Sequence, residues 1–132
     1  MKGKCLCESV TIESDDVAEF EACHCSMCRR WGGGPLLAVH CGSNISITGK
    51  DSIKVYESSE WAERSFCSHC GTHLYYHLKP TDEYIVPLGL FNEESSISFK
   101  RQIFIDQKPS SYEFSNQTEN LTEQQVFDSF GV

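Results

Sequence analysis

Long apolar runs are missing from this sequence, and so is any excess of basic side chains. No apolar run approaches the roughly 20 residues that a membrane-spanning helix needs, so we expect no membrane span. The 11 Lys and Arg residues are outnumbered by 19 Asp and Glu residues, which gives a formal net charge of -8. A chain this acidic repels nucleic acid and anionic membranes, so we expect neither as a partner.

An export signal is also lacking at the start of the sequence. Residues 1–5 lead directly to a cysteine, without the apolar stretch that a secretory signal carries. We therefore expect a cytoplasmic location, where thiols stay reduced. No repeat, low-complexity tract or linker divides the chain, so we expect one domain over residues 1–132.

Cysteine, by contrast, is plentiful, and seven of the eight cysteines fall into three short clusters. The clusters are Cys5 with Cys7, then Cys23 with Cys25 and Cys28, then Cys67 with Cys70, while Cys41 stands apart. Such close spacing in a reducing compartment favours metal binding over disulfides or plain burial. Thiolate sets suit zinc, Cu(I) or iron–sulfur clusters, and the spacings match neither ferredoxin pattern. Zinc is therefore our first choice.

The first and third clusters can be combined into one closed metal site. A pair of cysteines separated by one or two residues places both sulfurs on one metal ion, and tetrahedral zinc needs two such pairs. Cys5 and Cys7 with Cys67 and Cys70 would tie the N-terminus to the middle of the chain. Because metal affinity would then be linked to folding, we interpret this site as structural.

The middle cluster is left with three thiolates and needs a fourth ligand. Candidates for that ligand are Cys41, His24, His69, His73 and His77. If one of them binds, the second metal is structural as well. If none does, water or an external thiol takes the fourth position, and a coordinated thiol loses its proton. The thiolate produced in this way is the reactive form of sulfur. An open position is typical of catalytic zinc, so we favour it.

Several residues around the middle cluster are candidates for substrate contacts. Arg29 and Arg30 follow Cys28 directly, and a guanidinium can grip a glutathione carboxylate or form an ordinary surface salt bridge. The glycines at 32–34 form a flexible turn or let the backbone approach a ligand. His24 lies between two ligands, where we expect a surface or supporting histidine rather than a proton relay.

Short alternating segments separated by turn residues indicate an all-β, sandwich-like fold. The expected strands are 10–13, 36–39, 44–48, 53–56, 62–66, 73–77, 84–88 and 97–105. A short helix is expected over 25–31. A second short helix is expected at the C-terminus, where Thr122 and Gln125 have capping-box spacing. Val126, Phe127 and Phe130 would form its apolar face.

Four motifs, taken in order, carry a family resemblance over nearly the whole chain. They are Gly3-x-Cys5-x-Cys7, Cys23-His24-Cys25-Ser26-x-Cys28-Arg29-Arg30, Arg64-x-Phe66-Cys67-x-x-Cys70-Gly71-x-x-Leu74, and 104–109 with Tyr112. With these motifs the sequence resembles the glutathione-dependent formaldehyde-activating enzyme and centromere protein V family. The family usually has glycine after the second cysteine of the first cluster, where this sequence has Glu8. Glycine there would permit a positive φ.

The resemblance implies a fold, a pair of zinc sites and a reaction. The fold is β-rich, zinc-bound and Mss4-like. A structural zinc is implied at Cys5, Cys7, Cys67 and Cys70, and a catalytic zinc with an open position at Cys23, Cys25 and Cys28. The implied activity is that of a carbon–sulfur lyase, which forms or breaks S-(hydroxymethyl)glutathione from glutathione and formaldehyde.

Two functions therefore stand at the level of sequence. The first is a zinc-dependent enzyme whose partners are a small-molecule thiol, such as glutathione, and a small aldehyde. The alternative is a zinc-stabilised binding module with two closed metal sites and no turnover. The discriminating feature is whether the second metal exchanges a ligand. Nucleic-acid binding, by analogy with centromere protein V, is disfavoured by the net charge.

Overall fold

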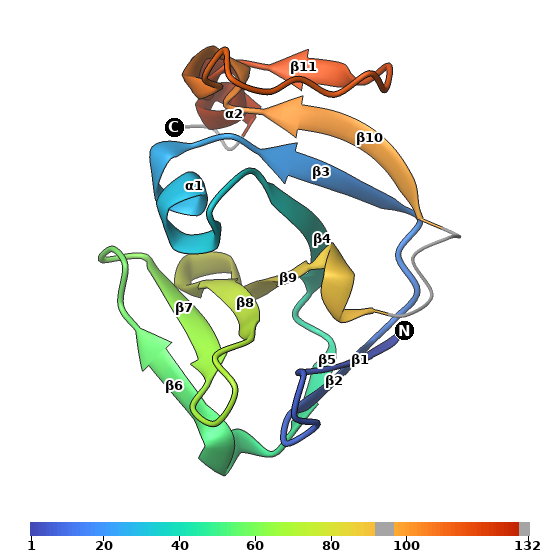
Figure 1. Cartoon of the computed structure of the whole chain (residues 1–132), viewed down its shortest axis with the longest axis vertical. Helices are drawn as coiled ribbons and strands as arrows, with labels where there is room; N and C mark the ends of the chain where they lie inside the picture. Colours follow the sequence, from blue (N-terminus) through green and yellow to red (C-terminus); the bar gives the residue numbers. More distant parts are fainter. Residues whose placement is uncertain (92–96, 130–132) are drawn as a thin grey trace.

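The strands of the protein form two sheets, seen in a computed structural model that describes residues 1–91 and 97–129 (Figure 1). The strands of the smaller sheet are, in order, β1 (Lys2–Lys4), β2 (Thr11–Ser14) and β5 (Ile45–Thr48). The strands of the larger sheet are, in order, β11 (Glu119–Leu121), β10 (Ser98–Ile103), β3 (Glu19–Cys23), β4 (Leu36–Gly42), β9 (Glu83–Pro87), β8 (His73–Leu78), β7 (Ala62–Cys67) and β6 (Ile53–Tyr56). The predicted all-β class is confirmed.

Pairing in the larger sheet is mostly antiparallel, but β10 lies parallel to both β3 and β11. Each predicted strand segment overlaps an observed strand, whereas β1, β3 and β11 were not predicted. The sequence of β3 carries two glutamates, which made the segment look polar. One of them, Glu21, is buried and pairs with His40 and Arg101 of the neighbouring strands.

The hydrophobic core lies where the two sheets meet. Ile12 of β2 and Val10 just before that strand pack against Val39, Leu74 and Val86 of the larger sheet, and all five are fully buried. Cys5 and Cys67 belong to the same cluster of buried residues. The cysteines near residues 5 and 67 therefore lie at the edge of the core. Burial of apolar side chains holds the segments that carry them in place.

Two short α-helices lie within the described residues, and both were expected. Helix α1 (Ser26–Gly32) lies between β3 and β4 and ends at Gly33, whose N–H donates to the Arg29 carbonyl. Near the C-terminus, α2 (Glu123–Ser129) packs beside β11 at one end of the larger sheet (Figure 1). No helix within the described part of the chain has the length and apolarity to cross a lipid bilayer.

The start of α2 is set by the predicted capping box. The Gln125 N–H donates to the Thr122 hydroxyl at 3.2 Å, and the Thr122 N–H donates back to the Gln125 side chain at 2.8 Å. Val126 is buried as expected, while Phe127 is 40% exposed. Phe130, expected on the apolar face, lies outside the described residues.

Candidate metal centres

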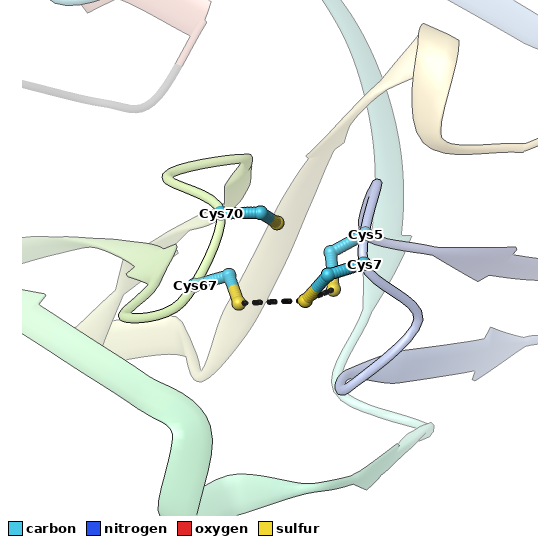
Figure 2. Close-up of side chains that lie close together, drawn as sticks. All are labelled: Cys5, Cys7, Cys67 and Cys70. Atoms are coloured by element: carbon cyan, nitrogen blue, oxygen red, sulfur yellow. Dashed lines mark hydrogen bonds between the residues drawn. The ribbon is translucent and has the colours of Figure 1, made fainter.

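Cys5, Cys7, Cys67 and Cys70 converge from two loops, with their sulfurs directed toward one another (Figure 2). All four sulfurs lie within 4.8 Å of one another. The Cys5–Cys7 and Cys7–Cys67 sulfur pairs are each 3.7 Å apart. Zinc–sulfur bonds of about 2.3 Å in a tetrahedron place the sulfurs about 3.8 Å apart, so the cluster fits a zinc ion.

The two loops are held in place by backbone contacts. The Leu6 N–H donates to the Thr72 hydroxyl at 3.1 Å, which joins one loop to the other. Gly3 in β1 passes so close to Leu90 that a Cβ atom there would lie 2.5 Å from the Leu90 carbonyl oxygen. Only glycine permits this approach, and it fixes the strand that leads into Cys5.

Neutral groups surround the sulfurs of this first cluster. The Val10 N–H donates to the Cys5 sulfur at 3.3 Å, and the Thr72 hydroxyl lies 3.2 Å from the Cys70 sulfur. The bond to Thr72 lowers the pKa of Cys70 to about 5, whereas burial raises the pKa of Cys5 to about 11. All four sulfurs must be ionised to bind a metal, and a bound cation would stabilise the four thiolates together.

Cys23, Cys25 and Cys28 form a second cluster, with sulfurs within 4.8 Å of one another. Cys23 ends β3, and Cys28 lies in the first turn of α1. Cys25 is the N-cap of that helix, and its sulfur accepts the Cys28 N–H at 3.3 Å. The strand-to-helix turn therefore gathers all three sulfurs within six residues, as their spacing predicted.

The second cluster also favours a cation. Hydrogen bonds from Cys23 and Cys28 lower the pKa of Cys25 to about 2, so one sulfur ionises easily. The same bonds, with burial, raise the pKa of Cys23 far above its ordinary value. Three adjacent thiolates repel one another in a buried place, and a divalent metal removes that repulsion. Each cluster can thus hold a metal ion.

No fourth histidine, cysteine or carboxylate joins this second cluster within residues 1–91 and 97–129. The candidates considered for that position are engaged or directed elsewhere. Cys41 is buried in the core, and His69 is exposed. His73 stacks on Trp31, and His77 pairs with the carboxylates of Glu63 and Asp82.

His24 is completely buried, so of the two expected positions, surface or supporting, the surface one does not apply. Its Nε2 donates to the Gln102 side-chain oxygen and its Nδ1 accepts from the Tyr112 hydroxyl, both at 2.8 Å. Burial lowers the pKa of His24, which keeps the ring neutral. Alternation along the chain turns this ring away from the metal ligands on either side, toward Tyr112 and Phe114. It supports the loop of the second cluster.

Arg29 and Arg30 lie in α1 beside Cys28 but in different surroundings. Arg29 is half-buried, and its Nε donates to the His24 carbonyl oxygen at 2.9 Å. Arg30 is exposed. Arg29 therefore ties the helix to the loop of the second cluster, while Arg30 presents an exposed positive charge on the same helix.

Arg64 belongs to the second cluster's surroundings, although the sequence indicated it only as part of a motif. It lies in β7, is 5% exposed, and donates from Nη1 and Nη2 to the Cys28 sulfur at 3.7 and 3.8 Å. Its guanidinium carbon lies 5.0 Å from the ring centroids of both Trp31 and Tyr76. The sequence pointed to Arg64 only through its place in the motif, two residues before Phe66. Its contact with Cys28 could not be predicted, because the contact joins β7 to α1, two elements far apart in the sequence.

The comparisons with known proteins give the chain a family. Residues 1–107 match the model of the glutathione-dependent formaldehyde-activating enzyme (GFA) family. The chain belongs to the GFA family. This confirms the resemblance found in the sequence.

Individual relatives agree with the family assignment. An uncharacterized lyase of Schizosaccharomyces pombe is 34% identical to this GFA protein over 130 residues, covering 97% of this chain and 95% of the relative. A putative glutathione-dependent formaldehyde-activating enzyme of Podospora anserina is 35% identical over 78 residues, covering 54% of this chain and 37% of the relative. The alignment thus spans well under half of that second relative.

The fold also occurs among solved structures. A crystal structure of a Rhodobacter sphaeroides protein superposes with a TM-score of 0.58 at 24% identity, covering 76% of this GFA protein and all of the other chain. At this identity the likeness concerns the fold alone. It supports the strand-rich architecture described above.

Proposed function

We propose that this protein is a zinc-dependent enzyme of the carbon–sulfur lyase type. Its substrates are a thiol such as glutathione and formaldehyde or another small aldehyde, which it joins into an S-hydroxymethyl adduct or releases from one. One observation carries the proposal: the second cluster gathers three sulfurs and, within the described chain, no fourth ligand. Family membership and a lyase-named relative support the same class of activity.

The two clusters take different roles in this proposal. Cys5, Cys7, Cys67 and Cys70 hold a structural zinc, because a closed four-thiolate set joined to the core stabilises the fold. Cys23, Cys25 and Cys28 hold the catalytic zinc. The thiolate-only donor sets and their sulfur spacing are what support zinc at both places.

The chemistry needs neither an oxidant nor a reductant. Zinc at the second cluster would lower the pKa of a thiol at its fourth position and so supply a thiolate at neutral pH. The thiol gives up its proton, and its sulfur donates an electron pair to the carbonyl carbon. A carbon–sulfur bond forms, and the former carbonyl oxygen takes a proton to become a hydroxyl. The reverse reaction breaks the same bond.

Positive side chains beside the site would recruit the anionic thiol. Glutathione carries carboxylates, and the protein as a whole has a formal charge of -8. Arg30 and the outer nitrogens of Arg29 therefore offer a local positive charge at the second cluster.

Cobalt substitution tests the proposal directly. The protein is loaded with Co²⁺ and titrated with glutathione while the near-ultraviolet and visible spectrum is recorded. We expect sulfur-to-cobalt charge transfer to grow as a thiol enters the second site, and formaldehyde then to yield the adduct in an NMR assay. Cys25→Ser is the matched control, because it removes a ligand from the second cluster and leaves the first intact.

An unchanged spectrum with two fully loaded tetrahedral sites would refute thiol activation. Both metals would then be closed, and the protein would be a zinc-stabilised binding module. A reducing, cytoplasmic environment is part of the proposal, since oxidation of the ligand thiols would release the metals.

A further inference from the structure

We propose that Arg64 is a positioning residue of the second cluster, one that fixes the Cys28 sulfur and offsets the negative charge that an incoming thiolate adds to the site. This inference rests on the proposed function in one respect, the binding of an external thiol. The rest of it concerns how the chain's own residues are arranged around Cys28.

The guanidinium of Arg64 is aimed and held by its surroundings. Both Nη groups donate to the same sulfur, at 3.7 and 3.8 Å, so the fork of the guanidinium spans the Cys28 thiolate. Trp31 of α1 and Tyr76 of β8 each lie 5.0 Å from the guanidinium carbon. Tyr76 is the register partner of Arg64 across β7 and β8. Two aromatic rings thus hold the charge in place by cation–π attraction.

Apart from Cys28 and the two aromatic rings, Arg64 has no partner among residues 1–91 and 97–129 that would explain its burial. No carboxylate of the described residues forms an ion pair with it, and its Nε has no hydrogen-bond partner there. A buried cation without an anion is costly, because the charge loses its hydration. The negative charge that compensates Arg64 is therefore that of the cysteine sulfurs, through Cys28.

A charge count shows why this cation matters at the second cluster. Three thiolates and one divalent metal carry a formal charge of -3 + 2 = -1. A fourth, external thiolate makes it -2, and Arg64 returns the sum to -1. Cys23 and Cys28 are 7% and 5% exposed, so water screens little of this charge.

The first cluster provides an internal comparison. Its four thiolates with one divalent metal would also carry -2, but its hydrogen-bonding neighbours are neutral: Ser9, Val10 and Thr72. Cys7 is exposed, so water can screen the charge there. A guanidinium is thus placed at the buried cluster of three sulfurs, where the proposed thiol would add a negative charge.

The test compares three variants loaded with Co²⁺. Arg64→Met removes the charge at similar length, Arg64→Lys keeps a charge without the fork, and Arg101→Met is the control. Arg101 is a paired arginine of the same sheet that contacts Glu21 and Glu119 and no sulfur. We expect Arg64→Met to weaken glutathione binding by about 10- to 100-fold and to shift the charge-transfer band before thiol is added. Arg64→Lys should fall between, and Arg101→Met should match the wild type.

The outcomes separate this inference from the proposed function. An unchanged band and thiol affinity in Arg64→Met would overturn the role of Arg64. A wild-type spectrum that does not respond to glutathione would refute the proposed function instead. Competition with a chelator then tests Arg64 alone, with Co²⁺ at the second cluster expected to bind about 10- to 100-fold more weakly in Arg64→Met. If Arg64→Met does not fold, the same measurements are made on Arg64→Lys, which retains the buried charge. Wild-type thiol and metal affinity in Arg64→Lys would then overturn the role of the guanidinium fork.

Discussion

Glu8 and Gly71 adopt the same left-handed backbone conformation, with φ values of 65° and 76°. Each residue directly follows the second cysteine of a pair in the first cluster, Cys7 or Cys70. The Glu8 N–H donates to the Cys5 carbonyl at 3.0 Å, and the Gly71 N–H donates to the Cys67 carbonyl at 2.9 Å. The two halves of the first cluster thus close with a left-handed residue at the same place, although the hydrogen bond spans three residues at Glu8 and four at Gly71. At one of these places the chain carries a glutamate where the family usually has glycine.

Replacing Glu8 with glycine should stabilise the protein slightly. A side chain in the left-handed region costs about 1–2 kcal/mol, while glycine adds about 0.5–1 kcal/mol of chain entropy to folding. The ion pair of Glu8 with Lys4 is exposed and contributes little. We expect Glu8→Gly to raise the free energy of unfolding by about 0.5–1 kcal/mol, measured by urea denaturation of the zinc-loaded protein.

Gly71→Ala is the matched comparison for that substitution. A Cβ atom at Gly71 meets no atom within 4 Å, so its cost is that of the backbone alone, about 1 kcal/mol. If Gly71→Ala stabilises the protein and Glu8→Gly destabilises it, a positive φ is not what sets the free energy of unfolding at these two positions.

Removing one ligand of the first cluster should unfold the protein or nearly so. Structural zinc contributes about 10–16 kcal/mol in small zinc domains, which equals or exceeds the stability of a typical domain. Cys67 is also part of the core. We expect Cys67→Ser to lose one metal per chain and to show no cooperative thermal transition by circular dichroism.

Removing one ligand of the second cluster should give a different result. We expect Cys25→Ser to lose one metal per chain and to reduce adduct formation by about 100-fold or more, while the thermal transition persists. The measurements are metal content, calorimetry and turnover on the same samples. If Cys25→Ser unfolds the protein as Cys67→Ser does, the division into structural and catalytic sites is wrong.

The pair formed by Glu21 and His40 should make stability depend on pH. Burial opposes ionisation of Glu21, but the hydrogen bond and charge of His40 outweigh it and lower the Glu21 pKa from 4.5. Glu21 likewise raises the His40 pKa above 6.5 despite burial. The Glu21 contribution is present above pH 4.5 and lost as pH falls through its folded pKa. The His40 contribution is present below pH 6.5 and lost as pH rises through its folded pKa.

The stabilising effect of this pair is therefore greatest between pH 4.5 and 6.5. We expect the difference in melting temperature between wild type and His40→Gln to be largest in this window and to shrink at higher pH. The exposed His69 lies outside this pair and supplies the control, because His69→Gln should give only a small difference in melting temperature. A His40 difference that grows above pH 7 would contradict the assignment.

The hydroxyl of Tyr112 should matter for stability and not for turnover. Tyr112→Phe leaves the buried Nδ1 of His24 without a donor, which costs about 1–3 kcal/mol. We expect that loss in denaturant unfolding, with kcat for adduct formation unchanged at saturating metal. The exposed Tyr56 provides the control through Tyr56→Phe, which should alter neither quantity. A fall in kcat without loss of stability would instead make His24 a proton relay.

The sequence was sufficient to predict local structure wherever a short pattern sets it. The capping box at Thr122 and Gln125 is such a case, because both hydrogen bonds span three residues. The cluster of Cys23, Cys25 and Cys28 is another, since one turn gathers the three sulfurs. The pairing of Cys5 and Cys7 with Cys67 and Cys70 was also found, because zinc needs four ligands and two cysteine pairs were available.

Contacts between distant strands were decided by the tertiary structure alone. The parallel pairing of β3 with β10 joins segments far apart in the sequence, and no local pattern records such a choice. The burial of His24 depends on Gln102 and Tyr112, which arrive from that distant part of the chain. The sequence thus determined the cysteine clusters and the short elements, because these depend on neighbouring residues. Only folding brought Arg64 to Cys28, because that contact requires β7 and β8 to pack beneath α1.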